Sequence, residues 1–376
     1  MEIRISRESL LAGVQRVQGV VEVKGAMPIL SYLLIATDEE GVYIQATDLE
    51  IGIKGYYPAN VTRQGQAALN ARKLYDIIRE LPPNLEIHMA QEENDWVTMK
   101  CGKSMFRLPG IPAGDFPAFP EYHEDSLMEF KGSLLKEMIR KTAFAVSPDE
   151  TRKAISGLLL EMNGKFAAMV GTDGHRLAFV NRPLLKSNPS SEEKVPFLLP
   201  KKTLSELLKF MEDDESVYAF SVKGNHFAFI QDKQVIVSRA IDGKFPNYQQ
   251  VIPSDNPIKV PVNKEQLLHA LKRVSLLADE QSKMVRFKIA DGRLTLISDS
   301  TELGAAEEEV PISYKGEKVS IGLNAKYVLE ILSVIDEEEV ILNLKDKDHS
   351  CLITVKDDSD FLSLVMPMRM NGYDEE

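Results

Sequence analysis

The chain has 376 residues, of which 57 are acidic and 45 basic, so its formal net charge is −12. This length allows two or three domains, and a composition that is 44% hydrophobic and 27% charged is that of an ordinary globular protein. An acidic total argues against a protein that coats nucleic acid or anionic membrane with its whole surface. It leaves room for a local basic face.

The two cysteines, Cys101 and Cys351, lie far apart in the sequence. Two thiols cannot build a disulfide framework or a four-thiolate zinc site within one chain. The N-terminal residues lack the long apolar core of a signal peptide, and no window approaches the length of an apolar membrane span. We therefore expect a reduced, cytoplasmic protein that is neither exported nor inserted in a membrane.

The first predicted helix has an apolar stripe over residues 10–17, with apolar side chains at the first, second, fifth and eighth positions. This is the spacing of one helical face. The same spacing recurs over residues 267–274 and, less completely, from residue 134, so the offsets are 124 and 133. A recurring helix at this distance predicts an internal repeat.

A second helical pattern supports the repeat. Residues 69–78, 199–208 and 323–332 align with one another at offsets of 130 and 124. Short β-rich segments separated by turn residues lie around the helices. They are residues 32–36, 41–46, 85–89, 97–99, 158–162, 166–170, 216–222, 285–289, 294–297 and 339–344. The pattern predicts three copies of an α+β unit, each with two helices and antiparallel strands.

Proline and charge concentrate without periodicity at residues 117–125 and 252–257, which we take as the junctions between copies. The polar segment 186–194 falls between the strands and the second helix of the middle copy, so we expect an internal loop there. The predicted domains are residues 1–124, 125–256 and 257–376.

A search for catalytic patterns finds little. The six histidines are scattered, and the sequence Gly102-Lys103-Ser104 lacks the first glycine of a phosphate-binding loop. Asp173, His175 and Arg176 form the most polar cluster and could make an acid/base site.

The repeat offers another explanation for this cluster. Thr172-Asp173 has counterparts at Thr47-Asp48 and Ser298-Asp299, and a repeated hydroxyl–carboxylate pair is typical of turns at strand ends. We therefore expect turn chemistry there, with no catalytic residue, metal site or cofactor.

The basic residues concentrate on the predicted helices. Residues 7–18, 71–81, 132–142, 201–211, 264–275 and 325–335 together carry a net charge of +8, which leaves −20 for the rest of the chain. The helices could thus form an electropositive face that contacts phosphates without regard to sequence, although solvated helix faces also carry such cations. Aromatic residues rarely interleave with these charges, which favours duplex over single-stranded nucleic acid.

Several short segments, in this order on a threefold repeat, identify a resemblance. They are Leu10-Leu11, Met27-Pro28-Ile29-Leu30, Ala46-Thr47-Asp48-Leu49-Glu50, Thr172-Asp173-Gly174-His175-Arg176-Leu177, Asp242-Gly243-Lys244-Phe245-Pro246-Asn247-Tyr248 and Met366-Pro367-Met368-Arg369. Over essentially its whole length the chain resembles the bacterial DNA sliding clamp, the β subunit of the replicative polymerase III. The resemblance implies a head-to-tail homodimeric ring in which the helices line a central hole and the antiparallel sheets lie outside.

A clamp of this kind is not an enzyme. The resemblance implies that it encloses double-stranded DNA and gives the polymerase processivity. The cations expected to face the DNA are loop residues matched by position, together with helix residues. They are Lys24, Arg72, Lys73, Arg140, Arg152, Lys153, Lys201, Lys202 and Arg273.

The family also has a pocket between the second and third domains that receives a short peptide with a Gln and apolar anchors. Such peptides come from polymerases, the clamp loader and repair proteins. The resemblance implies a lining of Ile155, Thr172, Gly174, His175, Arg176, Leu177, Pro246, Val251, Asn324, Tyr327, Met366, Pro367, Met368, Arg369 and Met370. Soft apolar side chains with a few polar groups suit peptide recognition.

For the contact between protomers, the family geometry implies Phe106 and Leu108 from the first domain, and Leu276 and Leu277 from the third. Two other readings of the sequence stay open. One is an acidic scaffold that binds peptides in the same pocket without DNA, and the other is an enzyme that works at Asp173, His175 and Arg176.

Overall fold

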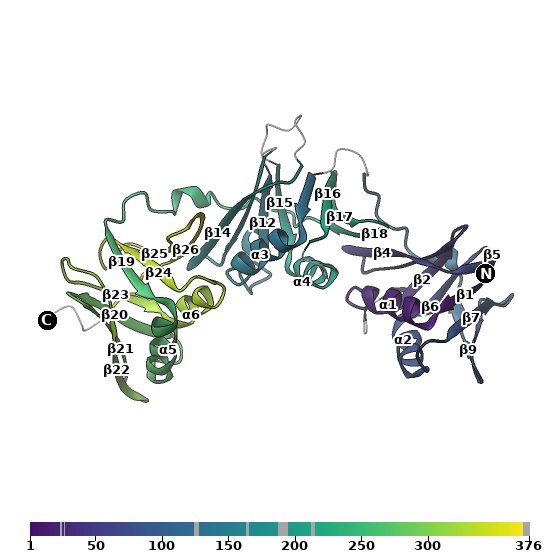
Figure 1. The fold of residues 1–376 in the computed structure, drawn as a ribbon, viewed down its shortest axis with the longest axis horizontal. Coiled ribbons are helices and arrows are strands. Elements are labelled where there is room, and N and C mark those ends of the chain that lie inside the picture. Colours follow the sequence, from purple (N-terminus) through teal and green to yellow (C-terminus); the bar gives the residue numbers. More distant parts are fainter. Residues whose placement is uncertain are drawn as a thin grey trace. The chain divides into compact units, whose positions relative to one another are not determined.

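Figure 1 shows a computed structural model of the chain, which describes residues 1–22, 25, 27–123, 128–162, 165–186, 195–211 and 215–370. These residues divide into two compact units. The first comprises Met1–Ser133, Leu185–Asn188 and Ser205–Ala240, and the second comprises Leu134–Leu184, Pro189–Leu204 and Ile241–Glu376, apart from the residues outside the described ranges.

The helices are α1 (Arg7–Val17), α2 (Ala71–Glu80), α3 (Gly132–Ala143), α4 (Lys201–Phe210), α5 (Lys264–Val274) and α6 (Ala325–Ser333), with short 3-10 turns η1 (Pro28–Ser31), η2 (Ala113–Asp115), η3 (Lys153–Ile155), η4 (Tyr248–Gln250) and η5 (Ser275–Leu277). Polar caps begin several of the helices. The Ser6 hydroxyl accepts from the Ser9 amide at 3.1 Å, and the Asn70 side chain accepts from the Lys73 amide at 3.0 Å.

The first unit contains two antiparallel sheets. One has the order β5-β1-β7-β8-β9 and the other β10-β6-β2-β3-β4-β18-β17-β16-β11. Their strands are β1 (Glu2–Ser6), β2 (Tyr32–Thr37), β3 (Gly41–Thr47), β4 (Ile51–Pro58), β5 (Asn60–Arg63), β6 (Gln66–Asn70), β7 (Glu86–Gln91), β8 (Val97–Cys101), β9 (Ser104–Leu108), β10 (Gly110–Ile111), β11 (Met128–Lys131), β16 (Val217–Lys223), β17 (His226–Gln231) and β18 (Gln234–Arg239).

The second unit also has two antiparallel sheets, of order β15-β12-β13-β14-β26-β25-β24-β19 and β22-β21-β20-β23. Their strands are β12 (Gly157–Met162), β13 (Phe166–Thr172), β14 (Arg176–Pro183), β15 (Val195–Pro200), β19 (Ile258–Asn263), β20 (Met284–Ala290), β21 (Arg293–Ser300), β22 (Gly304–Pro311), β23 (Val319–Asn324), β24 (Glu339–Leu344), β25 (Cys351–Val355) and β26 (Asp358–Val365).

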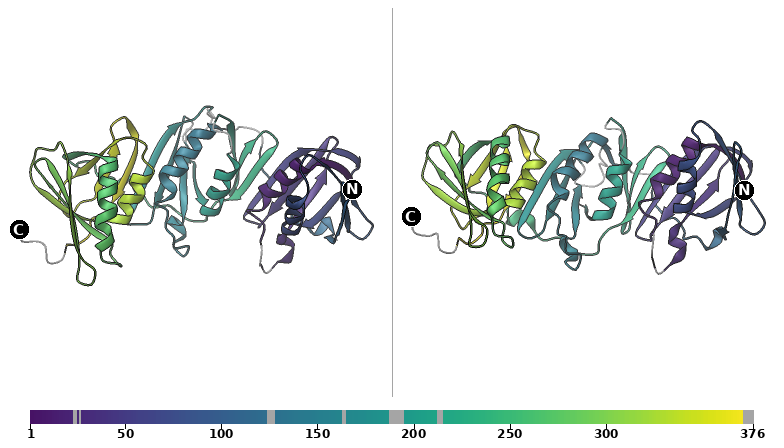
Figure 2. Two further views of the ribbon diagram at one scale, coloured as in Figure 1. Left: turned by 60° about the horizontal axis from the view of Figure 1, so that its bottom comes forward. Right: turned by 90° about the horizontal axis from the view of Figure 1, so that it is seen from below.

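Two helix pairs, α1 with α2 and α5 with α6, lie side by side (Figure 2). A basic side chain at the start of the first helix caps the end of the second in each pair. Arg7 Nε donates to the Ile78 carbonyl at 3.1 Å, and Lys264 Nζ donates to the Ile335 carbonyl at 3.0 Å. The last carbonyls of a helix lack partners within the helix, so Arg7 satisfies one of them in α2, while Lys264 binds a carbonyl just beyond the end of α6. The pairs are therefore antiparallel.

The apolar stripes predicted from the sequence form the buried faces. Leu10, Val14 and Val17 of α1 are fully covered, as are Leu267 and Leu271 of α5. The order strand, helix, strands, helix, strands occurs three times along the chain, so the predicted repeat and its α+β class are confirmed. The segment 187–194, which is most of the predicted internal loop, and the predicted boundary at 124/125 lie outside the described residues.

The repeats are joined through their sheets. Strand β4 of the first copy pairs with β18, the last strand of the second copy, and β14 of the second copy pairs in the same way with β26, the last strand of the third. Two strands in equivalent positions, β9 and β22, end their sheets and have no such neighbour among the described residues.

Candidate functional site

The turn between β13 and β14 is held by its own side chains. The Thr172 hydroxyl donates to the Arg176 carbonyl at 2.6 Å, and the Asp173 carboxylate accepts from the amides of His175 and Arg176 at 2.9 and 3.1 Å. Gly174 has a φ of +93°, a conformation that a side chain would strain. The turn is therefore rigid, and it leaves His175 exposed at its tip.

Arg176 is buried at the base of this turn, 7% exposed, and its guanidinium reaches several elements. It donates to Asp173 at 3.1 Å and to the Phe144 carbonyl at 2.7 Å, and it pairs with Glu330 of α6. It also lies 4.5 Å from the centre of the Tyr327 ring. A buried charge held by two carboxylates, a carbonyl and a ring is a fixed part of the site.

The first copy contains the same turn without the arginine. Thr47 donates to the Ile51 carbonyl at 2.9 Å, and Asp48 accepts from the Glu50 and Ile51 amides at 3.0 and 2.7 Å. The predicted turn chemistry is thus confirmed in two copies, and the Asp173 carboxylate is occupied by it.

The prediction was wrong for the third copy. Ser298 and Asp299 lie inside β21, and the Ser298 hydroxyl donates to the Val274 carbonyl at 2.7 Å. Strand β21 continues to Ser300, so the chain turns later than the repeat predicts, because two more residues separate this pair from the next strand.

The predicted pocket residues of the chain end lie beside this turn. The Met366 amide donates to the His175 carbonyl at 2.8 Å, and the Met368 amide donates to the Gly322 carbonyl at 2.8 Å. Asn324 caps α6, where its side chain accepts from the Tyr327 amide at 3.3 Å. The structure thus connects His175 and Arg176 with the chain end and the start of α6.

The other predicted members differ in exposure. Ile155 and Leu177 are buried and support the site from below, whereas Val251 and Met366 are 47% and 39% exposed. Pro246 and Arg369 are exposed, Pro367 and Met368 half-buried, and Met370 buried against Gly322. Exposed apolar side chains beside a rigid polar turn are suited to binding the apolar residues of a peptide.

Tyr248 was not among the site residues predicted from the sequence, although the segment 242–248 contributed to the family resemblance. Its ring is 6% exposed and packs with Leu177 and Leu364, and its hydroxyl donates to Glu161 at 2.8 Å. Burial and the bond to Glu161 raise the pKa of Tyr248. Tyr248 and Glu161 line a cavity of about 260 Å³ whose wall includes Phe179 and Ile252. A single aromatic residue in a loop carries no sequence signal of such a role.

The predicted DNA-facing cations fall into two groups. Five of them are exposed, namely Arg72, Lys73, Lys153, Lys201 and Lys202. Partial burial of the Lys201 ammonium group lowers its pKa. Counted over their observed bounds, the six helices carry a net charge of +8, as expected from the sequence. Lys24 lies outside the described residues.

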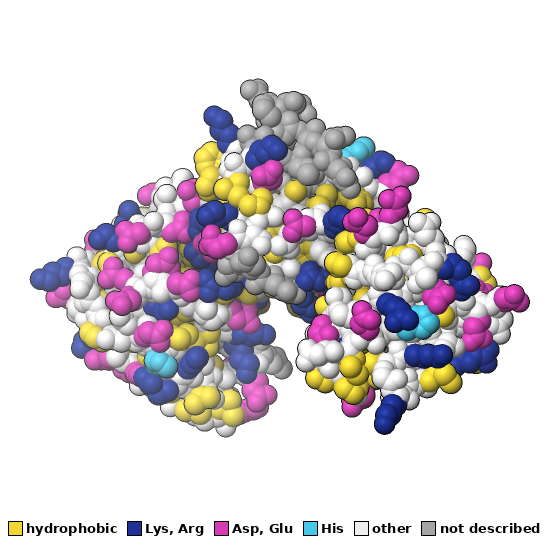
Figure 3. Space-filling view, turned by 45° about the vertical axis from the view of Figure 1, so that its right-hand side comes forward, with side chains coloured by type: hydrophobic (Ala, Val, Ile, Leu, Met, Phe, Trp, Pro, Cys, Tyr) yellow, Lys and Arg dark blue, Asp and Glu magenta, His cyan; other side chains and the backbone are white. Residues whose placement is uncertain are grey.

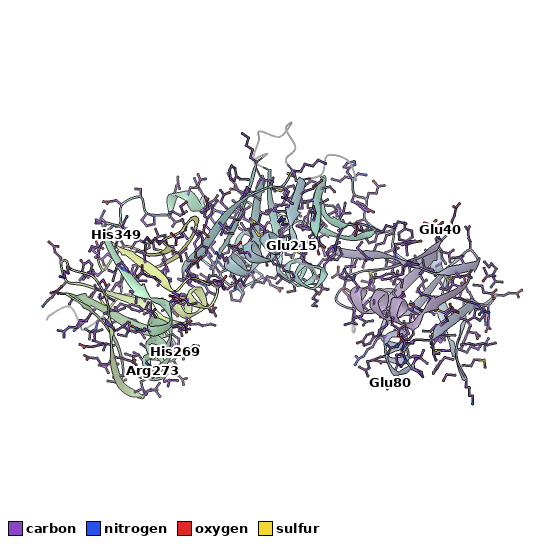
Figure 4. All side chains as sticks on the ribbon, in the orientation of Figure 1. Glu40, Glu80, Glu215, His269, Arg273 and His349 are labelled. Carbon is purple, nitrogen blue, oxygen red and sulfur yellow. The ribbon has the colours of Figure 1, made fainter. Side chains whose placement is uncertain are left out.

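Arg140, Arg152 and Arg273 are exposed as well, and each makes a defined contact within the fold. Arg140 of α3 makes a two-pronged ion pair with Asp336, and Arg273, which projects from α5 in Figure 4, makes one with Glu308 of β22. The hydrogen bonds to Asp336 and Glu308 raise the pKa of Arg140 and Arg273, respectively. Arg152 Nη1 donates to the Asp173 carbonyl at 2.9 Å. The acidic partners reduce the field that Arg140 and Arg273 add to a basic surface.

The predicted protomer contacts lie on or beside β9 and β22, which each end a sheet. Phe106 and Leu108 are half-buried on β9, while Leu276, 75% exposed, belongs to η5, which packs against β22. Met105, which is also on β9, is 68% exposed. Acidic and basic side chains intermingle over the face shown in Figure 3.

Comparison with known proteins relates this architecture to a family. Models of the N-terminal, central and C-terminal domains of the DNA polymerase III beta subunit match residues 1–120, 129–247 and 249–369. The Beta sliding clamp of Pseudomonas aeruginosa is 32% identical over 371 residues, which cover 98% of this chain and 100% of the relative. The chain belongs to the DNA polymerase III beta subunit family.

Solved structures of sliding clamps agree. The sliding clamp of P. aeruginosa bound to griselimycin superposes with a TM-score of 0.93 at 32% identity, covering 98% of this chain and 100% of that one. The sliding clamp of Bacillus subtilis does so with a TM-score of 0.93 at 26% identity, covering 98% and 99%. The chain thus has the three-domain fold of a beta sliding clamp.

Membership of the beta sliding clamp family gives the chain the function of a DNA sliding clamp, a processivity factor in DNA replication that tethers partner proteins to DNA. This role is non-catalytic. Among the helices in the described ranges, none is long and apolar enough to cross a membrane. In the same part of the chain, no three His, Cys, Asp or Glu side chains converge as metal ligands would.

Proposed function

We propose that this sliding clamp acts in the cytoplasm as a head-to-tail homodimeric ring around duplex DNA, without catalytic activity of its own. The observation that carries the proposal is the repeated sheet pairing. Strand β4 pairs with β18 and β14 with β26, while β22 and β9 hold the equivalent positions without a neighbour. Pairing β22 of one chain with β9 of another continues the series, and two such contacts close it.

The side chains around these edges support the pairing. Unpaired strand edges with exposed apolar residues favour association, and Met105, Leu276 and Leu303 are 68%, 75% and 42% exposed. Strand β22 carries Glu307, Glu308 and Glu309 in succession. A run of like charges on one edge disfavours pairing of that edge with its own copy.

We propose domain limits of 1–124, 125–256 and 257–376. Each segment then contains one strand-helix-strands-helix-strands set. The net charge of +8 on the helices supports a DNA-facing role for them, and the remaining charge of −20 supports an outer surface that repels polyanions. Weak, sequence-independent phosphate contacts suit a protein that must slide.

We further propose that peptides of polymerases, clamp loader and repair proteins bind beside the 172–176 turn. Met366 and Val251 supply exposed apolar surface, and His175 supplies a polar group. The fixed Arg176 holds α6 and the turn together, so the site is largely preformed.

Retention on DNA tests the ring. The protein, loaded on nicked circular DNA, should remain bound through a high-salt wash and leave after the circle is cut. Replacing Phe106 and Leu276 together by Asp should halve the mass in solution and abolish retention. Leu185→Asp, at another exposed apolar position, should change neither. Equal loss from circular and linear DNA would overturn the ring.

The cations and the pocket are tested separately. Reversing Arg72 and Lys73 to Glu should shorten retention on the circle, and the effect should exceed that of reversing Arg140.

Replacing Met366 and Val251 by Asp should weaken binding of a Gln-Leu-x-Leu-Phe peptide at least roughly tenfold without affecting retention. Peptide binding with no retention on circles would support the acidic scaffold instead.

A further inference from the structure

A second cavity lies in the first unit, far in sequence from the 172–176 turn. It has a volume of about 650 Å³ and lies among α1, β4, β18 and the second half of α4. Figure 1 shows α1, β4 and β18 adjoining one another. Its size is within the range of about 300–1,000 Å³ that is typical of small-molecule sites. Nothing in the sliding-clamp role described above uses it.

The cavity contains a buried carboxylate. Glu206 of α4 is 5% exposed, and its Oε1 accepts from Lys209 Nζ at 2.8 Å. Its carboxylate lies directly against Gly19, where a Cβ would come within about 2.0 Å of Oε2. An ionised carboxylate is costly to bury unless a cation or several donors face it. The Lys209 side chain is itself 67% exposed, so this partner sits at the mouth of the cavity.

The rest of the lining includes both apolar and polar side chains. Ile53, Tyr57, Phe210 and Ile236 are buried and form the floor. The Arg16 guanidinium lies 5.1 Å from the centre of the Phe210 ring. The Phe210 ring face is thus already occupied by Arg16, which leaves the Glu206 carboxylate as the group that a ligand cation would contact.

We infer that this cavity binds an organic cation of the amidinium or guanidinium class that carries a flat apolar group. The two N–H groups of such a cation match a carboxylate in a two-pronged arrangement. Its apolar group would lie against Tyr57, which at 9% is the most exposed side chain of the floor. Lys209, whose side chain is 67% exposed, would return to solvent, and the bound cation would replace it as the partner of the buried carboxylate.

Titration of the full-length chain with benzamidine tests the inference, with benzamide and benzoate as ligands of matched shape. Benzamidine should bind with a Kd of about 1 mM or tighter, and the two controls should bind much more weakly. Glu206→Gln should weaken benzamidine roughly 10- to 100-fold, and Glu215→Gln, at an exposed carboxylate, should not.

A second variant guards against a folding defect in Glu206→Gln. Ala12 is exposed on α1 at the mouth of the cavity, so Ala12→Trp should block entry without disturbing the core. The inference is overturned if benzamidine binds no better than benzamide, or if both Ala12→Trp and Glu206→Gln bind it as wild type does.

The same cationic group ends an arginine side chain, so N-acetyl-Phe-Arg amide is titrated in parallel. Tighter binding of this dipeptide than of benzamidine would assign the site to an arginine of a peptide. Tighter binding of benzamidine would assign it to a free aromatic cation. A failure of both ligands to bind would overturn the inference and leave the ring and the peptide pocket untouched.

Discussion

The two places where one repeat joins the next, β4 with β18 and β14 with β26, share a backbone and differ in side chains. At each junction, the last strand of one repeat ends beside the turn that precedes the strand with which it pairs. The Arg239 amide donates to the Glu50 carbonyl at 2.9 Å in the first junction, and the Met366 amide to the His175 carbonyl at 2.8 Å in the second. Backbone pairing is therefore the common joint.

Side chains at equivalent positions then make opposite environments. Ala12, Arg16 and Tyr57 line the 650 Å³ cavity of the first junction. The buried residues Leu135 and Met138 of α3 follow Leu10 and Gly13 of α1 at an offset of 125, one more than the apolar pattern of the sequence indicated. At this offset the counterparts are Glu137, Lys141 and Arg182.

The three counterparts form a closed ionic cluster with Asp358 in the second junction. Lys141, 3% exposed, contacts Glu137 at 2.9 Å and Asp358 at 3.3 Å, and Arg182 pairs with both carboxylates. The same fold thus leaves a cavity at the first junction and fills the second with ion pairs.

The largest expected effect comes from breaking the ionic cluster. Asp358→Ala leaves Lys141 and Arg182 buried with one carboxylate fewer, so the free energy of unfolding should fall by about 3–5 kcal/mol. Asp255→Ala removes the carboxylate of an exposed pair with Lys345 at 3.6 Å and should cost less than about 1 kcal/mol. Urea denaturation of both variants measures this, and equal losses would contradict the buried cluster.

A second comparison concerns the two turns, which differ in having Arg176 or Ile51 at the last position. Arg176→Met should keep the volume but leave Asp173 and Glu330 without their cation, which costs about 1–3 kcal/mol. Peptide affinity should fall with it, because α6 and the turn are no longer held together. If Arg176→Met bound peptide as wild type does, the turn would not need its arginine for recognition.

Low pH should destabilise the second junction more than the first. Burial alone would raise the pKa of Glu137 and Asp358, but hydrogen bonds from Arg182 and Lys141 outweigh it and lower both. Because the folded pKa values are lowered, this stabilisation is present above the unfolded values of about 4 and is lost as pH falls below them. Hydrogen exchange should show protection of β26 falling between pH 6 and 3 more than that of β18. A larger loss at β18 would contradict this assignment.

The smallest effect is expected where the first junction is given a residue of the second. Ala12→Glu places at the mouth of the cavity the side chain that Glu137 contributes to the cluster. Ala12 is exposed, so the free energy of unfolding, measured by thermal denaturation, should change by no more than about 0.5 kcal/mol. Glu137→Ala, measured alongside, should cost more, and the reverse order would contradict the difference between the junctions.

The sequence alone determined the local and repeated features of this protein. Apolar spacing placed α1 and α5, and β-rich segments placed ten of the strands that the structure describes. The Thr172-Asp173 and Thr47-Asp48 pairs indicated turns that the hydrogen bonds confirm. These features depend on neighbours a few residues away, so a linear pattern contains them. The excess of cations on the helices was also countable in advance.

Only the tertiary structure decided which charges meet. Arg140 finds Asp336, 196 residues away, and Lys141 finds Asp358, 217 residues away. No periodicity encodes such partners, because long side chains choose among many carboxylates once strands and helices are packed. The same holds for the Glu206 carboxylate against Gly19, since a cavity is the space that distant elements leave unfilled.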